Sequence, residues 1–86
     1  MAWTIEWTEA AKKQLRKLDR QLARQIVDYV DKKASRDPRA QGKALTAQFA
    51  SLWRYRVGDH RVVVSIEDAR LVVLVVRVGH RREVYR

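Results

Sequence analysis

The stretch Leu52–Val78, LWRYRVGDHRVVVSIEDARLVVLVVRV, carries the pattern that decides the fold. Gly58-Asp59 interrupts two segments of alternating character, and a two-residue loop with glycine first is typical of a type II′ hairpin turn. Such a turn fixes how the two flanking strands pair. The predicted pairs are Val57–His60, Arg56–Arg61, Tyr55–Val62 and Arg54–Val63.

The predicted register gives the two faces of this hairpin different chemistry, because side chains alternate between the faces of a strand. One face is apolar and is expected to form the core, and it consists of Trp53, Tyr55, Val57, Val62, Val64 and Ile66. The other face carries Arg54, Arg56 and Arg61. Like charges directly opposite one another destabilise a sheet. The arginine cluster therefore favours a face that receives an anion.

The segment Leu71–Val78 is apolar at nearly every position. This is typical of a strand covered on both faces, or of one with an exposed apolar patch. A second turn at Asp68-Ala69 would pair Ile66 with Leu71, Val64 with Val73 and Val62 with Val75. Four apolar residues would then form an exposed strip on the arginine face. We predict that this strip, Val63, Val72, Leu74 and Val76, binds a protein partner, the alternative being that the tail or a dimer mate covers it.

The residues before this stretch predict one strand and two helices. Trp3, Ile5 and Trp7 alternate with polar residues and indicate a short strand. Thr8 and Asp19 are good N-caps for two successive helices. The expected apolar stripes are Ala11, Leu15 and Leu18 in the first helix, and Leu22, Ile26, Tyr29, Val30 and Ala34 in the second, over roughly residues 20–35 before Asp37-Pro38.

Residues 39–51 read as a connector with a turn at Gly42 and room for a short helical turn. The order of elements is then strand, helix, helix and three strands, with a short further strand at 83–85 as an option. This order predicts an α+β fold in which the N-terminal strand and the helical hairpin pack on one face of a mainly antiparallel sheet of about four strands. We expect residues 1–86 to form a single domain, with the three tryptophans at the edge of the core and Tyr29 and Tyr55 as packing residues.

The composition points to a polyanionic partner. Nineteen Lys and Arg stand against ten Asp and Glu, a net charge of +9, which favours binding to RNA, DNA or an acidic protein segment. The absence of cysteine excludes disulfides and thiolate metal sites, and only two histidines argue against zinc, so no metal or cofactor is expected. The longest apolar run, LVVLVV, is too short to span a membrane, and the N-terminus does not resemble a signal peptide. We expect a cytoplasmic protein without a membrane partner.

Arginines beside an aromatic residue are typical of proteins that bind an RNA backbone and stack on its bases. The chain has no paired carboxylates, Ser-His-Asp set, HExxH motif or glycine-rich phosphate loop. The pattern therefore favours phosphoryl transfer assisted by fixed charge, such as cleavage of RNA by its own 2′-hydroxyl, or a non-catalytic basic binding module. The expected patch consists of Arg54, Arg56, Arg61, Arg81 and Arg82 with His80 and Tyr85.

The chain resembles the RelE toxins of bacterial and archaeal toxin–antitoxin systems, within the RelE/ParE superfamily. The resemblance covers the opening strand, the helical hairpin, Lys43-Ala44-Leu45, the LWRYRVGDHRVVVSI hairpin and the closing VGHRREVY, which is similar to the family's VGKR…EVY ending. This ending favours the RNA-cleaving branch over the gyrase-poisoning ParE branch. The resemblance implies a metal-independent endoribonuclease that cuts mRNA in the ribosomal A site, leaving a cyclic phosphate and a 5′-hydroxyl.

The resemblance also implies roles for individual residues. Arg54 and Arg56 fall where the family has two basic strand residues, usually Lys, that hold the substrate phosphate. Arg61 matches the hairpin arginine that stabilises the transition state, and Arg81 matches the arginine proposed to protonate the leaving oxygen. Tyr85 matches the tyrosine that stacks on the nucleotide.

Further candidates follow from the same positions. Because arginine is a poor general base, the arginines at 54 and 56 are expected to bind phosphate without taking a proton. His80 stands where the family often has Lys, and as a catalytic candidate it could accept or donate a proton or simply contact phosphate. Lys43 and Arg82 are candidate substrate-binding residues.

Toxins of this family are held inactive by an antitoxin. The resemblance therefore implies a RelB-like antitoxin that covers the apolar strip or a sheet edge, in a heterotetramer or a larger complex, with the ribosome and mRNA as the other partners. A gyrase inhibitor on the same fold remains the alternative, as does the binding module.

Overall fold

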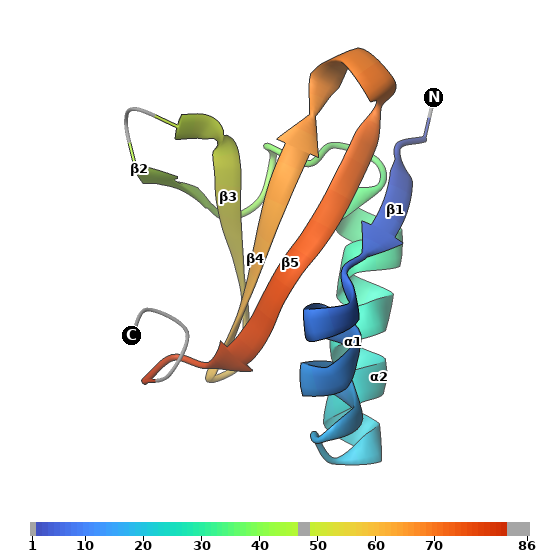
Figure 1. The fold of residues 1–86 in the computed structure, drawn as a ribbon, viewed down its shortest axis with the longest axis vertical. Helices are drawn as coiled ribbons and strands as arrows, with labels where there is room; N and C mark the ends of the chain where they lie inside the picture. Colours follow the sequence, from blue (N-terminus) through green and yellow to red (C-terminus); the bar gives the residue numbers. More distant parts are fainter. Residues whose placement is uncertain (1, 47–48, 83–86) are drawn as a thin grey trace.

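Two helices lie against one face of a five-stranded sheet in the computed structural model, which describes residues 2–46 and 49–82 (Figure 1). In chain order the elements are β1 (Thr4–Trp7), α1 (Glu9–Arg16), α2 (Arg20–Tyr29), the π-helical turn η1 (Val30–Ala34), β2 (Lys43–Thr46), β3 (Phe49–Val57), β4 (His60–Glu67), the 3-10 turn η2 (Asp68–Arg70) and β5 (Val72–His80). Within the described residues, no helix is long and apolar enough to cross a membrane.

The strand order is β1-β5-β4-β3-β2, with β1 parallel to β5 and the other neighbours antiparallel. The α+β class and the helical layer on one face are confirmed. The sheet is wider than predicted because Lys43–Thr46 pairs with β3 as an edge strand, so the prediction of a connector there is wrong. β5 is an interior strand of the sheet, and its apolar residues are buried or half-buried on both faces, which fits its continuous apolar run. The optional strand at 83–85 lies outside the described residues.

Both predicted N-caps are present. The Thr8 hydroxyl accepts a hydrogen bond from the Ala11 N–H at 3.1 Å, and the Asp19 carboxylate accepts from the first turn of α2. The first helix ends at Arg16, slightly earlier than expected. The second is α-helical to Tyr29 and continues through the π-helical turn, which together cover the expected range.

The core lies between the helices and the sheet, and its composition confirms the predicted stripes. Tyr55 is fully buried, although its hydroxyl needs a partner there. The three tryptophans are partly buried at the edge of the core, as predicted. The buried members of this core are Ala11, Ile26, Val30, Ala34, Tyr55, Val62, Val64, Ile66, Val73, Val75 and Val78.

The first hairpin has the predicted register in full, with Val57 opposite His60 and Arg56 opposite Arg61. Gly58 has a φ of 59°. The next residue, Asp59, does not have a positive φ, because Leu71 is the only non-glycine residue with one in the described part of the chain. A positive φ at the first loop position alone is what a type II′ turn requires, and a type I′ turn would need it at both.

The second hairpin differs from the prediction. Its turn is η2 followed by Leu71 in the left-handed conformation, and Ile66 pairs with Val73 instead of Leu71. The sequence hid this turn because left-handed positions are usually glycine or asparagine. The predicted register is wrong by two residues. A shift of two keeps every side chain on its face, and Val73 and Val75 are therefore in the core as expected.

A β-bulge in β5 then changes the faces. Val64 pairs with Val75, but the next residue, Val63, pairs with Arg77, so that Val76 is an extra residue. Beyond the bulge the alternation is reversed. Arg77 therefore lies on the face opposite the helices, and Val78 enters the core at 2% exposure.

Residues at the start of the helical layer satisfy the backbone at this bulge. The Thr8 hydroxyl donates to the Val76 carbonyl at 3.3 Å, and the Val78 N–H donates to Gln14 Oε1 at 2.7 Å. Buried backbone groups without partners are costly. Thr8 and Gln14 therefore stabilise the bulge by satisfying its backbone groups, and Thr8 also caps α1.

The prediction of an exposed apolar strip is wrong for Val63 and Val72, which are 7% and 5% exposed. Leu74 and Val76 are half-buried. Val63 is flanked in register by arginine on both sides, and the stems of such side chains cover apolar neighbours. Val72 is covered because β1 adds to this edge of the sheet, a contact that the predicted topology lacked.

Gly42, directly before β2, has a φ of 76°, and a Cβ there would overlap the carbonyl oxygen of Arg54. Gly42→Ala should therefore combine left-handed strain with a clash against backbone and lower the free energy of unfolding by about 3 kcal/mol. Gly58→Ala is the matched control. Gly58 has a similar φ but open space around it, so only about 1–2 kcal/mol should be lost. Urea denaturation measures both, and equal losses would contradict the clash.

Candidate nucleic-acid interface

Basic side chains from four strands share the face of the sheet that the helices leave uncovered. Register places Lys43, Arg54, Val63 and Arg77 in one row across β2, β3, β4 and β5. A second row, nearer the Gly58 turn, contains Arg56, Arg61 and Gly79. We call the cationic members of the two rows the basic face, which is Lys43, Arg54, Arg56, Arg61 and Arg77.

The first row spreads its cations across the sheet. Neighbouring strands lie about 4.8 Å apart, so that Lys43 is one spacing from Arg54, and Arg77 lies two spacings, about 9.6 Å, on its other side. Lys43 and Arg77 are exposed and Arg54 is half-buried. A linear series of cations at this spacing suits the successive charges of a polyanion better than a single small anion.

Arg61 is the most unusual member, because it is only 7% exposed. Its Nη1 donates to the His60 carbonyl at 3.1 Å and makes a longer contact, 3.4 Å, with the Gly58 carbonyl. Within the described residues no carboxylate lies at ion-pair distance from it, and its cross-strand neighbour is Arg56. A buried charge without a counterion is costly. The site is therefore arranged to attract an anion.

Arg81 is held beside the same turn. Its backbone N–H donates to the Asp59 carbonyl at 2.9 Å, which ties the residue after β5 to the turn whose carbonyls hold Arg61. Arg81 and Arg82 are exposed. The structure thus brings Arg81 to the end of the sheet where Arg56 and Arg61 lie, while Tyr85 lies outside the described residues.

His80 is not on the basic face. It pairs with His60, their rings 5.5 Å apart and nearly perpendicular, and it follows Gly79, which lies in the row of Arg61. Alternation therefore puts His80 on the side of the sheet that carries the core. Its Nδ1 accepts a hydrogen bond from the Arg82 N–H at 3.2 Å, so that in the neutral ring the proton is on Nε2.

Arg77 is a member of this face that sequence reasoning missed. In an unbroken strand it would share the face of Val73 and Val75, and no pattern in the residues marks the bulge that moves it. The available signal was indirect. Without an irregularity, the alternation that buries Val75 would also bury an arginine.

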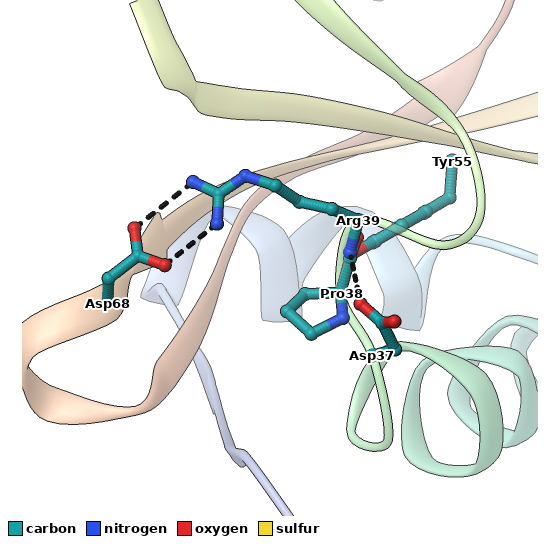
Figure 2. A network of polar contacts seen from close by, with 5 residues as sticks. All are labelled: Asp37, Pro38, Arg39, Tyr55 and Asp68. Carbon is teal, nitrogen blue, oxygen red and sulfur yellow. Dashed lines mark hydrogen bonds and ion pairs between the residues drawn. The ribbon is translucent and has the colours of Figure 1, made fainter.

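A polar network fixes the segment that leads into β2 (Figure 2). Arg39 binds Asp68 in η2 through two hydrogen bonds, at 2.7 and 3.1 Å, and its backbone N–H donates to Asp37 Oδ1 at 3.2 Å. The Tyr55 hydroxyl donates to the Pro38 carbonyl at 2.6 Å. These contacts hold the segment at both of its sides and so set where Lys43 begins β2.

The same network shifts the ionisation of its members. The hydrogen bonds from Arg39 lower the pKa of Asp68 below its ordinary value. Burial raises the pKa of Tyr55 well above its ordinary value, so that the hydroxyl remains a donor to Pro38. The Trp53 indole N–H extends the network by donating to the Gln41 carbonyl at 2.6 Å.

Comparison with known proteins gives consistent matches along the chain. The family model of the ParE toxin of the type II toxin–antitoxin system, parDE, matches residues 5–85. Toxin RelG of Mycobacterium tuberculosis is 31% identical over 86 residues, which cover 100% of this chain and 99% of the relative. Toxin RelE of the same organism is 30% identical over 79 residues, covering 92% and 81%.

Solved structures agree with these matches. The RelBE2 toxin–antitoxin complex from Mycobacterium tuberculosis contains a chain with a TM-score of 0.85 at 30% identity, covering 94% of this chain and 100% of that one. The isolated RelE toxin from E. coli has a TM-score of 0.79 at 23% identity, covering 92% and 84%, and supports the fold alone.

Asp68→Asn tests the network through pH. Because the folded protein lowers the pKa of Asp68, the ion pair stabilises the fold above the ordinary aspartate pKa, and this contribution is lost as pH falls through the lowered value. The variant should be less stable than the parent at pH 7, and the gap should close below about pH 4. Asp28→Asn, an exposed carboxylate on α2, should show no gap. Urea denaturation across pH measures both, and a gap that persists at low pH would contradict the assignment.

Arg61→Leu tests whether Arg61 serves binding at the expense of stability. Removing a buried cation that faces Arg56 should leave the free energy of unfolding unchanged or raise it by about 1 kcal/mol. Arg56→Leu, which removes the exposed partner of this pair, is the control and should gain less. A loss above about 2 kcal/mol for Arg61→Leu would show that Arg61 is a structural residue.

Proposed function

The chain belongs to the RelE/ParE family of type II toxin–antitoxin toxins, and from this premise we propose that it is a ribosome-dependent endoribonuclease that cleaves mRNA in the A site. The observation that supports this most is the buried Arg61, which faces Arg56 and has no carboxylate at ion-pair distance among residues 2–46 and 49–82. A protein that keeps two guanidinium groups opposite each other has a site prepared for an anion before the anion arrives, and such preorganised charge is what stabilises a phosphorane.

The proposed reaction needs position and charge more than acid–base groups. The 2′-oxygen of a ribose attacks the adjacent phosphorus, the bond from phosphorus to the 5′-oxygen breaks, and the products are a cyclic phosphate and a 5′-hydroxyl. The proton lost by the 2′-hydroxyl is gained, in net terms, by the 5′-oxygen. The protein lowers the barrier by holding the 2′-oxygen in line and by neutralising charge on the phosphorane.

Each proposed site residue has one part in this reaction. Arg54 and Arg56 bind the reacting phosphate, and Arg61, held by carbonyls of the turn, stabilises the phosphorane through the donors of its guanidinium group. Arg81 donates a hydrogen bond to the leaving 5′-oxygen, and Tyr85 stacks on the nucleotide. None of the arginines takes the proton, because a guanidinium group is already protonated and has no acceptor atom.

Lys43 and Arg82 have supporting parts in the proposal. Lys43 extends the row of Arg54 at the edge of the sheet, and Arg82 is exposed next to Arg81. Both add to the field that draws RNA to the basic face. His80, with its ring against His60, is left without a part in the proposed chemistry.

An antitoxin is the proposed regulatory partner. The solved RelBE2 relative is a toxin–antitoxin complex, and the chain here resembles its toxin. A RelB-like chain would inactivate this protein by covering the basic face with acidic residues and by packing apolar residues on Leu74 and Val76, the half-buried part of the strip. The complex would be a heterotetramer or larger, and the toxin would act in the cytoplasm, where ribosomes translate.

Primer extension on ribosome-bound mRNA tests the proposal. The parent protein should create new 5′ ends within A-site codons, whereas Arg61→Leu and Arg81→Ala should each slow single-turnover cleavage at least about 100-fold, since each removes a group that acts on the transition state. Arg24→Ala, an exposed arginine on α2, should cleave like the parent. Parent-like cleavage by both site variants would refute the assignment.

A gyrase inhibitor is the second candidate, because the matching family model is that of the ParE toxin. A supercoiling assay with purified gyrase separates the two. The nuclease proposal expects unchanged supercoiling together with new 5′ ends. Inhibited supercoiling without new 5′ ends would replace it with the gyrase function, and neither effect would leave a basic binding module.

A further inference from the structure

The β-bulge at Val76 places Arg77 on the basic face, and the proposed reaction assigns no role to this cation. From this placement we infer that Arg77 binds a second backbone phosphate, so that the RNA strand crosses the sheet along the row of Lys43, Arg54 and Arg77. The inference rests on the proposed function and specifies how the RNA lies on the site.

The row itself separates the two phosphate positions. Val63 stands between Arg54 and Arg77 in register, and it is 7% exposed. Its side chain fills the space between the two arginines near the sheet, so an anion cannot sit deeply between them. Arg54 and Arg77 therefore serve anions on either side of Val63, about two strand spacings apart.

The proposed reacting phosphate accounts for one of these positions. Arg54 and Arg56 are on β3 and Arg61 is on β4, so they converge around the hairpin of these two strands. Arg77 lies one strand further, on β5, and is exposed. From this exposed position its planar guanidinium group is able to reach a phosphate that neighbours the reacting one and to bind it through two donors.

The support for the bulge comes from the other side of the sheet. Gln14 Oε1 accepts from the Val78 N–H, and the Thr8 hydroxyl donates to the Val76 carbonyl. Without the bulge, Arg77 would share the face of the core residue Val75. Gln14 is thus a positioning residue for Arg77, although it lies in α1 on the opposite face.

Salt-dependent binding of uncleavable RNA tests the inference. A 2′-O-methyl hexanucleotide and dinucleotide lack the attacking hydroxyl, and fluorescence anisotropy gives Kd for each. Arg77→Gln should weaken hexanucleotide binding about tenfold and reduce the slope of log K against log salt by about 0.7, the loss of one single-strand phosphate contact. The dinucleotide, with one phosphate, should bind unchanged. Arg24→Gln removes the same charge from α2 and should alter neither probe.

The outcomes separate this inference from the proposed function. Arg54→Gln should weaken both probes. If Arg54→Gln weakens binding of both probes while Arg77→Gln binds both as Arg24→Gln does, the inference is overturned and the proposed function stands. An equal effect of Arg77→Gln on both probes would also overturn it, by placing Arg54 and Arg77 on one phosphate. If neither variant affects RNA binding and no cleavage occurs, the proposed function itself fails.

A double-mutant cycle tests the role of the bulge. Gln14→Leu removes the acceptor of the Val78 N–H without changing any charge. It should weaken hexanucleotide binding by a few-fold in the parent and add nothing in the Arg77→Gln background. An additive loss, or no loss in a folded variant, would show that Gln14 does not position Arg77. Far-ultraviolet circular dichroism confirms folding of each variant.

Discussion

The direct opposition of Arg56 and Arg61 is the constraint on which the rest of this structure depends. The Gly58 turn sets their register, and the turn carbonyls hold the Arg61 guanidinium without cancelling its charge. Such an arrangement works against stability. A small domain tolerates it only if the remaining fold is well packed, as it is here on the opposite face of the same strands, where Tyr55 and Val62 are fully buried.

The helical layer contributes more than a cover for the core. Thr8 caps α1 and also bonds to the bulge in β5, and Gln14, further along α1, satisfies the backbone just beyond it. Residues at the beginning of the chain therefore determine which side chains of β5 face away from the helices. A comparable role belongs to Arg39, which joins the segment before β2 to η2 and so places the edge strand (Figure 2).

Local sequence patterns predicted most of the fold and part of the site. Helix caps, apolar stripes and the Gly58-Asp59 turn are short-range features, each set by a few neighbouring residues. Apart from the unusual local turn at Leu71, the errors arose where partners distant in sequence decide. Lys43–Thr46 is a strand because β3 lies beside it, and Val72 is buried because β1 joins β5 in parallel. Neither pairing leaves a mark in the residues themselves.

The sequence alone determined the family resemblance, the helical hairpin and the three arginines of the first hairpin, because a two-residue turn and the period of two leave no other register for them. Only the tertiary structure decided that Arg77 joins them and that His80 does not. The reason is the extra residue at Val76. A bulge reverses alternation in a strand, and this one is held by hydrogen bonds from Thr8 and Gln14, more than sixty positions away in the chain.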